Sequence, residues 1–301
     1  MKRAAVIFHP EKHEDLVAFR AAVHEVMTEL GWAEPLWRET SVQDAGQGLV
    51  AAALREGVDL VLASGGDGTI AACVAALAGS GVPLGVLPAG TGNLLARNLG
   101  LPLSLGDALT AAMAGADRLL DVGVANGRLF AVMAGIGFDA EMLAGASEQL
   151  KKRVGWVAYA LSGLRRLRAR PMKAVLHADG APPLRCRASG IVIGNVGSLQ
   201  GNIRLLPHAL PDDGLLDVAV MPAKGLAGWL RLATGLLLRR RSAILHQLTC
   251  RELRIELDRA RPWEADGEVA GATRQLVISV RPRNLLVRVP ARGAAGSGAA
   301  G

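Results

Sequence analysis

Short apolar runs alternate with longer helical patterns through the first third of the chain. Apolar runs lie at residues 3–8, 35–40, 59–64 and 84–88, and helical patterns lie at 42–55 and in the stretch that Gly31 closes. Runs of this kind are typical of strands buried on both faces of a sheet. The alternation predicts a parallel sheet covered by helices, which we assign to residues 1–120.

The rhythm changes after residue 120. Two strands are expected in residues 119–137 around Asn126–Gly127, a dipeptide that favours a tight hairpin turn. The runs MKAVLHADG, ASGIVIGN, GLLDVAVM, ELRIELD and QLVISV then follow, each bounded by turn residues. We expect an antiparallel, β-sandwich-like domain at 121–290, with helical insertions near 150–170 and 224–241. Residues 291–301 are low in complexity and are expected to be disordered.

Composition narrows the class of protein. The chain has 301 residues, is half hydrophobic and carries a net charge of +7, which favours anionic partners. Aromatic residues make up 3%, too few for base-stacking platforms, so nucleic acid is not expected as a partner. The three cysteines form no CxxC pair, and no apolar run has signal-peptide or membrane-spanning length. A cytoplasmic location is expected.

A glycine-rich loop lies where the third strand should meet a helix. The segment SGGDGT places Gly65, Gly66 and Gly68 before an alanine-rich stretch suited to helix. Glycines let the backbone turn sharply and approach a ligand closely. Free N–H groups and the helix dipole would both favour phosphate there, although a tight turn without a ligand has the same composition.

A second loop strengthens the phosphate interpretation. The segment LPAGTGN repeats the design after the next strand, with Gly90, Thr91 and Gly92 ahead of another helical pattern. Both loops should emerge at the carboxyl edge of a parallel sheet, where ligands usually bind. Two such loops, with Asp67 able to hold a cation, predict a nucleotide with its metal.

Other nucleotide signatures are absent or incomplete. The chain has no G-x-x-x-x-G-K-[ST] segment and is therefore not a P-loop protein. The segment GIGFDA at 135–140 matches a dinucleotide pattern, but no acidic residue follows about 20 positions later, where the ribose contact belongs.

The motifs together resemble the catalytic domain of the diacylglycerol kinase and sphingosine kinase family, and its bacterial soluble members most closely. The resemblance rests on GGDGT, on P-A-G-T-G-N about twenty residues later, and on comparable motifs at 137–139, 207–217 and 266–268. It covers nearly the whole chain. It implies an ATP-dependent lipid kinase that uses Mg²⁺ and takes a lipid substrate at a membrane surface.

The resemblance also implies roles for individual residues. The nucleotide would contact Thr40, Gly65, Gly66, Asp67, Gly68, Thr69, Gly90, Thr91, Gly92 and Asn93. Asp266 would be the general base, with Glu268 as its close neighbour. A structural magnesium site would use Asp213 with the carbonyls of Leu210 and Leu215, and Asp67 would hold the cation of the nucleotide.

The chain departs from the family pattern in two places. Ala71 and Ala72 stand where the family commonly has Asn-Glu, and His9–Lys12 replaces a loop that usually begins Asn-Pro. Both changes remove polar groups expected near the nucleotide, and Lys12 could replace a phosphate contact. They leave open a protein that binds nucleotide or lipid but catalyses weakly.

Structural alternatives accompany the acidic residues and the basic helices. Asp266–Gly267 and Asp213–Gly214 would each suit a simple hairpin turn. The leucine- and arginine-rich stretches at 156–171 and 225–241 suit either a membrane interface, at the inner face of the membrane, or packing on the sandwich. A kinase acting on NAD or another small molecule is the rival enzyme. The sequence does not identify the lipid or the oligomeric state.

Overall fold

The chain forms two compact units in a computed structural model that describes residues 1–137, 171–199, 203–222 and 246–291. The first unit comprises Met1–Val122 and the segment that begins at Pro282, and the second comprises Gly123–Arg281. The first division lies close to the boundary expected at residue 120. Residues 282–290, expected in the second domain, return to the first unit.

The first unit is built on a parallel sheet. Its strands follow the order β15–β4–β3–β1–β2, and β15 joins β4 where Val287 lies opposite Leu84. The strands are β1 (Ala4–Phe8), β2 (Leu36–Glu39), β3 (Leu60–Gly65), β4 (Leu84–Pro88) and β15 (Glu268–Val289). Strands β1 and β3 are buried along their whole length, as expected for a sheet covered on both faces.

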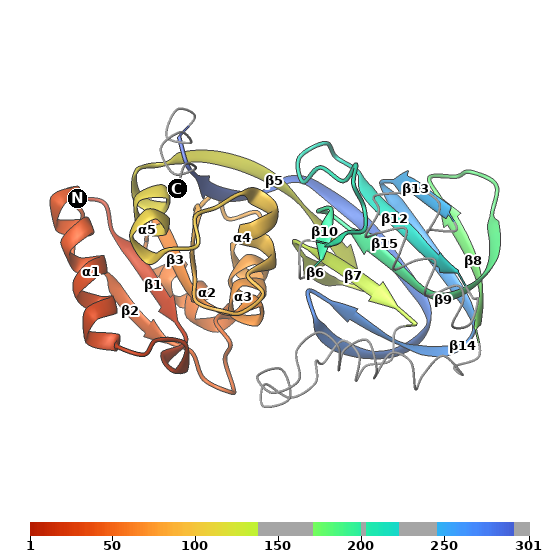
Figure 1. Ribbon diagram of the computed structural model, residues 1–301, viewed down its shortest axis with the longest axis horizontal. Helices are drawn as coiled ribbons and strands as arrows, with labels where there is room; N and C mark the ends of the chain where they lie inside the picture. Colours follow the sequence, from red (N-terminus) through yellow and green to blue (C-terminus); the bar gives the residue numbers. More distant parts are fainter. Residues whose placement is uncertain (138–170, 200–202, 223–245, 292–301) are drawn as a thin grey trace, which may run out of the picture. The chain divides into compact units, whose positions relative to one another are not determined.

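Helices cover this sheet (Figure 1). Two of them, α1 and α5, bury Phe19, Val23, Met27, Ala108, Leu109 and Met113 in one core with β1 and β3. The helices are η1 (Pro10–Lys12), α1 (Leu16–Glu29), α2 (Gln47–Arg55), α3 (Asp67–Leu77), α4 (Leu94–Leu99) and α5 (Leu105–Ala114). Helix α2 begins five residues later than the expected start at Val42, because Ser41 and Asp44 close a turn: Ser41 N–H donates to the Asp44 carbonyl at 2.9 Å.

The second unit is antiparallel. The two long strands β9 and β14 each pair with both β7 and β8, and β12 joins β9 to β13. The strands are β5 (Ala116–Ala125), β6 (Arg128–Phe130), β7 (Met133–Ile136), β8 (Met172–Ala178), β9 (Leu184–Gly194), β10 (Ser198–Leu199), β11 (Ile203–Arg204), β12 (Leu216–Pro222), β13 (His246–Cys250) and β14 (Glu252–Ala265). Strand β5 crosses from the first unit into the second.

This architecture confirms the expected fold class, an α/β unit followed by an antiparallel, sandwich-like unit. Aliphatic side chains of β7, β8, β9, β12, β14 and β15 share one core in the second unit. The Asn126–Gly127 turn joins β5 to β6 as expected, with positive φ at both residues. The helical insertions expected near 150–170 and 224–241 and the tail at 292–301 lie outside the described residues. Within the described ranges, no helix is both long and apolar enough to cross a membrane.

Candidate functional site

A pocket opens at the carboxyl edge of the parallel sheet. His9 follows β1, Thr40 follows β2 and Gly66 follows β3, so their strands deliver them to the same edge. Backbone hydrogen bonds continue the sheet to this point: His9 N–H donates to the Ser64 carbonyl and Thr40 N–H to the Phe8 carbonyl, both at 2.9 Å. This is the position at which parallel α/β sheets usually bind ligands.

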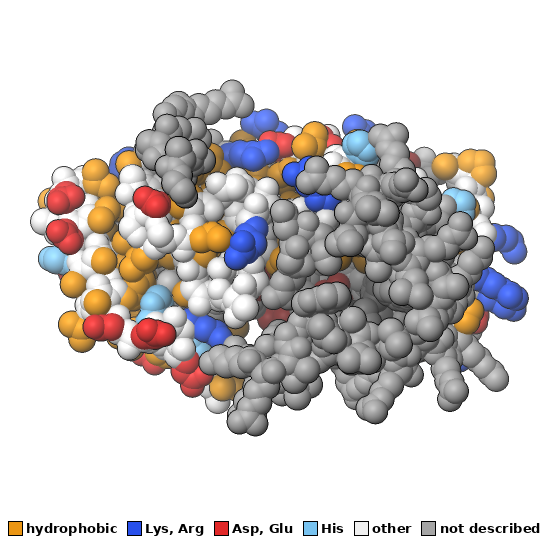
Figure 2. Space-filling view, viewed as in Figure 1, with side chains coloured by type: hydrophobic (Ala, Val, Ile, Leu, Met, Phe, Trp, Pro, Cys, Tyr) orange, Lys and Arg blue, Asp and Glu red, His pale blue; other side chains and the backbone are white. Residues whose placement is uncertain are grey.

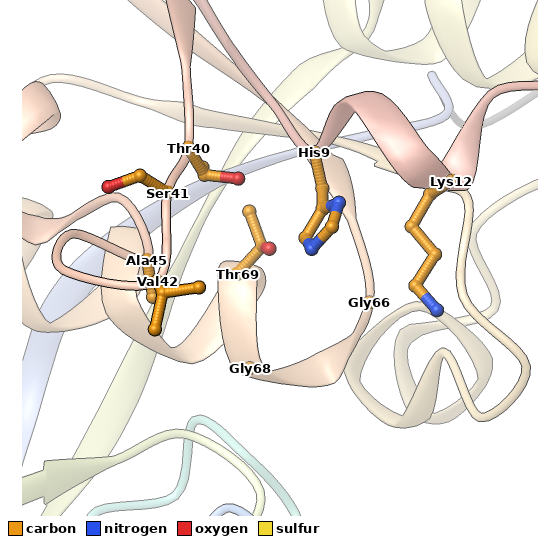
Figure 3. A pocket seen from close by; sticks show the side chains of 9 residues that line it. All are labelled: His9, Lys12, Thr40, Ser41, Val42, Ala45, Gly66, Gly68 and Thr69. Atoms are coloured by element: carbon orange, nitrogen blue, oxygen red, sulfur yellow. The ribbon is translucent and has the colours of Figure 1, made fainter. Parts of the chain in front are cut away.

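The pocket has a volume of about 310 Å³ and two chemically different sides. Figure 3 shows Lys12 on one side and Val42 with Ala45 on the other, with His9, Thr40 and Thr69 between them. The remaining lining residues are Ser41, Gly66 and Gly68. Val42 is fully exposed at the tip of the turn that Asp44 closes, so an apolar ligand surface could cover it.

Two buried polar atoms on the pocket wall have no hydrogen-bond partner among the described residues. They are the Thr40 hydroxyl and Nδ1 of His9, and the whole Thr40 residue is only 7% exposed. Burying a polar group without a partner costs about 1–3 kcal/mol, so such atoms are rare unless a ligand or water completes them. Both atoms could therefore be completed by a polar ligand or by water in this pocket.

Helix α3 points its N-terminus at the pocket. Gly66 is the N-cap and no side chain caps the helix, so the first-turn N–H groups are left for a ligand. Gly65 is required by packing, because a Cβ there would lie 2.7 Å from the Thr69 side chain. The glycine loop therefore forms a helix N-terminus, where Gly66, Gly68 and Thr69 line the pocket.

The second glycine loop packs directly on the first. A Cβ on Gly90 would lie 2.7 Å from the Cα of Gly66, so only glycine allows this approach. Asn93 closes the loop through two bonds to Gly90, donating to its carbonyl at 2.8 Å and accepting from its N–H at 3.0 Å. Asp67 joins the loops, because its Oδ1 accepts the Leu94 N–H at 2.6 Å. Thr91 is exposed.

A second histidine, His13, is partly buried in the first unit. His13 stacks on Phe19 with ring centroids 4.0 Å apart, and its Nε2 lies 3.2 Å from the Ser64 hydroxyl. Burial, and then the nearby His9, lower the pKa of His13 below its usual range. His13 therefore favours its neutral form and acts as part of the packing, whereas His9 faces the pocket.

Asp266 lies in the second unit, at the turn between β14 and β15. Its φ is +48°, and its own N–H donates to the Met133 carbonyl at 2.8 Å. Its carboxylate accepts three backbone N–H groups at 2.8–2.9 Å, from Ala131, Val132 and Met133. Asn195 holds the same segment through its amide, which donates to the Ala131 carbonyl at 3.0 Å.

Two further carboxylates flank Asp266 along the hairpin. Glu268 is half-exposed and pairs with Arg128. Glu264 is only 4% exposed, and its Oε2 accepts the Gly267 N–H at 2.8 Å. Burial raises the pKa of Glu264 to about 7, with a smaller contribution from the Asp266 charge and an opposing one from the Gly267 N–H.

The expected magnesium segment also lies in the second unit, before β12. Asp213 Oδ1 accepts the Leu215 N–H at 3.0 Å, and Leu210 is exposed. Burial raises the pKa of the neighbouring Asp217, the Asp213 charge raises it further, and His208 opposes both. Two carboxylates close enough to repel each other suit a cation. In the described parts of the chain, no three His, Cys, Asp or Glu side chains gather as a metal cluster.

The structure brings several of the predicted residues together. Thr40, Gly66, Gly68 and Thr69 line one pocket, with Gly65, Asp67 and the 90–93 loop packed beside it. Asp266, Glu268 and the 210–215 segment belong to the second unit. Sequence reasoning missed Ser41, Val42 and Ala45 in the pocket, and Glu264 beside Asp266. The short spacing in EADGE was the one signal for Glu264.

Comparison with known proteins adds to this geometry. Residues 3–125 match the diacylglycerol kinase catalytic domain, and residues 131–289 match the YegS C-terminal NAD kinase beta sandwich-like domain. A crystal structure of a diacylglycerol kinase from Bacillus anthracis has a TM-score of 0.76 at 23% identity, covering 96% of each chain. An NAD kinase from Archaeoglobus fulgidus has a TM-score of 0.54 at 13% identity. The fold is thus shared by diacylglycerol kinases and NAD kinases.

Relatives in sequence define the family more narrowly. A Pseudomonas fluorescens protein named "Probable lipid kinase YegS-like" is 34% identical over 96% of both chains. The diacylglycerol kinase of Bacillus subtilis is 33% identical over 78% of both chains. The chain belongs to the diacylglycerol-kinase-like family of bacterial lipid kinases, which confirms the expected resemblance.

Proposed function

We propose that the protein is an ATP-dependent lipid kinase that transfers the γ-phosphoryl group to a hydroxyl of a diacylglycerol-like or sphingoid-like lipid. The observation that carries the proposal is the pocket at the N-terminus of α3, where the Thr40 hydroxyl and His9 Nδ1 have no partner within the described part of the chain. A triphosphate would place anionic oxygens against the free N–H groups and Lys12. The adenine ring of ATP would lie on the apolar side of the pocket, against Val42 and Ala45.

The transfer itself needs an acceptor for the proton of the lipid hydroxyl. As the hydroxyl oxygen bonds to the γ-phosphorus and the bond to ADP breaks, Asp266 would take that proton. Three N–H bonds fix the orientation of its carboxylate. Glu268, held by Arg128, would support the same turn.

Magnesium would serve two places in this proposal. Asp67 offers a carboxylate at the start of α3, and one of its oxygens already accepts the Leu94 N–H. Asp213, with the carbonyls of Leu210 and Leu215, would hold a structural ion beside Asp217. When bound, the ion at Asp67 neutralises phosphate charge, and oxygen donors of this kind are those that Mg²⁺ prefers.

The direct test incubates labelled ATP with a mixed lipid extract and identifies the phosphorylated product. The parent protein should label a lipid, whereas Asp67→Ala should not. Labelling of NAD instead of lipid would favour the small-molecule kinase, which the shared NAD kinase fold keeps as the second candidate. ATP binding without turnover on any acceptor would favour a weak catalyst, consistent with Ala71 and Ala72.

The lipid substrate implies contact with an anionic membrane surface. Exposed Lys173, Arg185 and Arg187 lie on the adjacent strands β8 and β9, where Lys173 is opposite Arg187. Figure 2 shows Lys and Arg side chains at the edge of the molecule where Figure 1 places β8. Basic residues near an anionic surface contribute about 1 kcal/mol each. The protein should sediment with anionic vesicles at low salt and much less at high salt.

A further inference from the structure

The turn that carries Asp266 is held by two carboxylates. The Asp266 carboxylate accepts three backbone N–H groups from the segment 131–133, which lies earlier in the chain. The Glu264 carboxylate accepts the N–H of Gly267, on the other side of the turn, at 2.8 Å. The conformation between these anchors is an uncommon one, with φ of +48° at Asp266 and +84° at Gly267. The direction of the Asp266 carboxylate therefore depends on both sets of bonds.

Glu264 is placed where its charge matters. It is the last but one residue of β14, opposite Gly135 of β7 and Val269 of β15, and it is 4% exposed. Neither opposing residue carries a charge. Asp266 is the charged group that acts on its titration, and Glu268, further along the hairpin, pairs with Arg128 of β6. Among the described residues, this buried carboxyl accepts one N–H bond, from Gly267, and has an acidic neighbour in Asp266.

We propose that Glu264 is a positioning residue for Asp266, whose ionised carboxylate holds the Gly267 N–H and so fixes the turn from which Asp266 accepts the lipid proton. The proposal rests on the proposed function, because it assigns Glu264 to the same proton transfer. Glu264 does not contact the lipid in this scheme. It acts through the backbone of the turn alone.

The arrangement makes turnover depend on pH in a defined way. With a pKa of about 7, Glu264 is ionised at pH 8 and protonated at pH 6. A hydrogen bond to an ionised acceptor is roughly twice as strong as one to a neutral acceptor. Turnover should therefore fall about tenfold between pH 8 and pH 6 through loosening of the turn. Glu264→Gln keeps an oxygen acceptor that cannot ionise, so its turnover should stay near the low-pH value at both pH values.

The test measures kcat and KM for ATP from pH 5.5 to 9 with a lipid fraction that the parent phosphorylates. Glu256→Gln, on the exposed part of β14, is the matched control and should keep the parent profile. Loss of the acidic limb in Glu264→Gln with unchanged KM for ATP is the expected result. If the fall in kcat at acidic pH persists in Glu264→Gln, or if kcat of this variant is lowered equally at every pH, the inference about Glu264 is wrong and the proposed function stands. A parent without turnover at any pH overturns the proposed function and this inference together.

A measurement on the unsubstituted protein guards against a variant that fails to fold. The ¹⁵N and ¹H shifts of the Gly267 amide should titrate with a midpoint near pH 7, together with the side-chain carboxyl carbon of Glu264. The Ala18 amide, which donates to the exposed Asp15 carboxylate, is the reference signal. A Gly267 amide that stays constant from pH 6 to pH 8 contradicts the proposal.

Discussion

Lys12 and Val42 lie on opposite sides of one pocket, and this separates two kinds of ligand contact at the scale of single residues. Lys12→Met should weaken binding of ATP and of inorganic tripolyphosphate about tenfold, because it removes a charged hydrogen-bond donor. Val42→Ser should weaken the binding of ATP and of adenosine severalfold and leave the binding of tripolyphosphate unchanged, because it removes an apolar contact with the adenine ring. Calorimetric titration of each ligand measures both effects.

The control for Val42 is Val17→Ser, since Val17 is 79% exposed on α1 and does not line the pocket. It should bind all three ligands as the parent does. If Val42→Ser weakens the binding of tripolyphosphate and Lys12→Met weakens the binding of adenosine, the nucleotide binds in the opposite orientation, with its phosphates near Val42.

Asp67 carries both a charge and a hydrogen bond, and two substitutions separate them. Asp67→Asn keeps an oxygen for the Leu94 N–H but removes the charge that would hold the metal. It should therefore melt near the parent temperature and lose nearly all lipid phosphorylation. Asp67→Ala loses the bond as well and should be about 1 kcal/mol less stable than Asp67→Asn. Near-normal turnover in Asp67→Asn would exclude a metal role. Asp15→Asn, at the aspartate that caps α1, is the control.

The pocket residues differ in how far the sequence could predict them. Gly66, Gly68 and Thr69 were predictable because strand–glycine–helix order alone places N–H groups at a helix N-terminus. Val42 could not be predicted as a pocket residue. The hydrogen bonds of Asp44 make α2 begin later in the chain, so Val42 lies at the tip of a loop and not in the expected helix. The anchoring of Asp266 was equally hidden, since its three partners lie more than 130 residues away in the chain.

At the scale of elements, the β5–β6 hairpin depends on Asn126 for two separate reasons. Its φ is +45°, and its amide accepts the Val277 N–H at 2.8 Å and donates to the Gln275 carbonyl at 3.1 Å. Asn126→Ala should lower the free energy of unfolding by about 2–4 kcal/mol, since it loses both bonds and strains the turn. Asn126→Gly should lose about 1–2 kcal/mol, because glycine accepts the same φ. Urea denaturation compares them, and equal losses would show that backbone strain contributes nothing.

Strand lengths were the least predictable feature of the elements. The sequence suggested separate short strands at ELRIELD and QLVISV, whereas β14 and β15 are long strands joined at Asp266–Gly267. Charged residues and Pro262 interrupt the apolar alternation between them. The register shifts between Glu256 and Arg261 and again between Trp263 and Glu264, so bulges absorb the interruption. Alternation of apolar and polar residues identifies the buried part of a strand. It does not show that the strand continues past a β-bulge, outside the core.

At the scale of the whole molecule, two strands join the units. Strand β5 leaves the first unit after Val122, and β15 returns to it at Pro282. Beside the return, the fully buried Asp121 accepts the Arg283 N–H at 2.7 Å, and Arg283 has a φ of +51°. The sequence could not predict the return, because a parallel strand added from the end of the chain has the same local pattern as an antiparallel one.

Glu264 should also influence the stability of the whole chain. Its pKa is 4.5 in an unfolded chain and about 7 in the folded one, so between these values the folded protein holds a proton that the unfolded chain has lost. The free energy of unfolding should therefore decrease as pH rises from about 4.5 to about 7, by about 3 kcal/mol from this residue.

Substitution tests this directly. Glu264→Gln has no charge to bury, so its stability relative to the parent should be about 3 kcal/mol more favourable at pH 8 than at pH 5. Urea denaturation at both pH values measures the difference, and Glu256→Gln, at a half-exposed position of the same strand, is the control. A relative stability that is the same at pH 5 and pH 8 would mean that Glu264 titrates normally. A gain in stability at pH 8 that accompanies lost turnover would show that the buried charge is retained for activity at a cost to the fold.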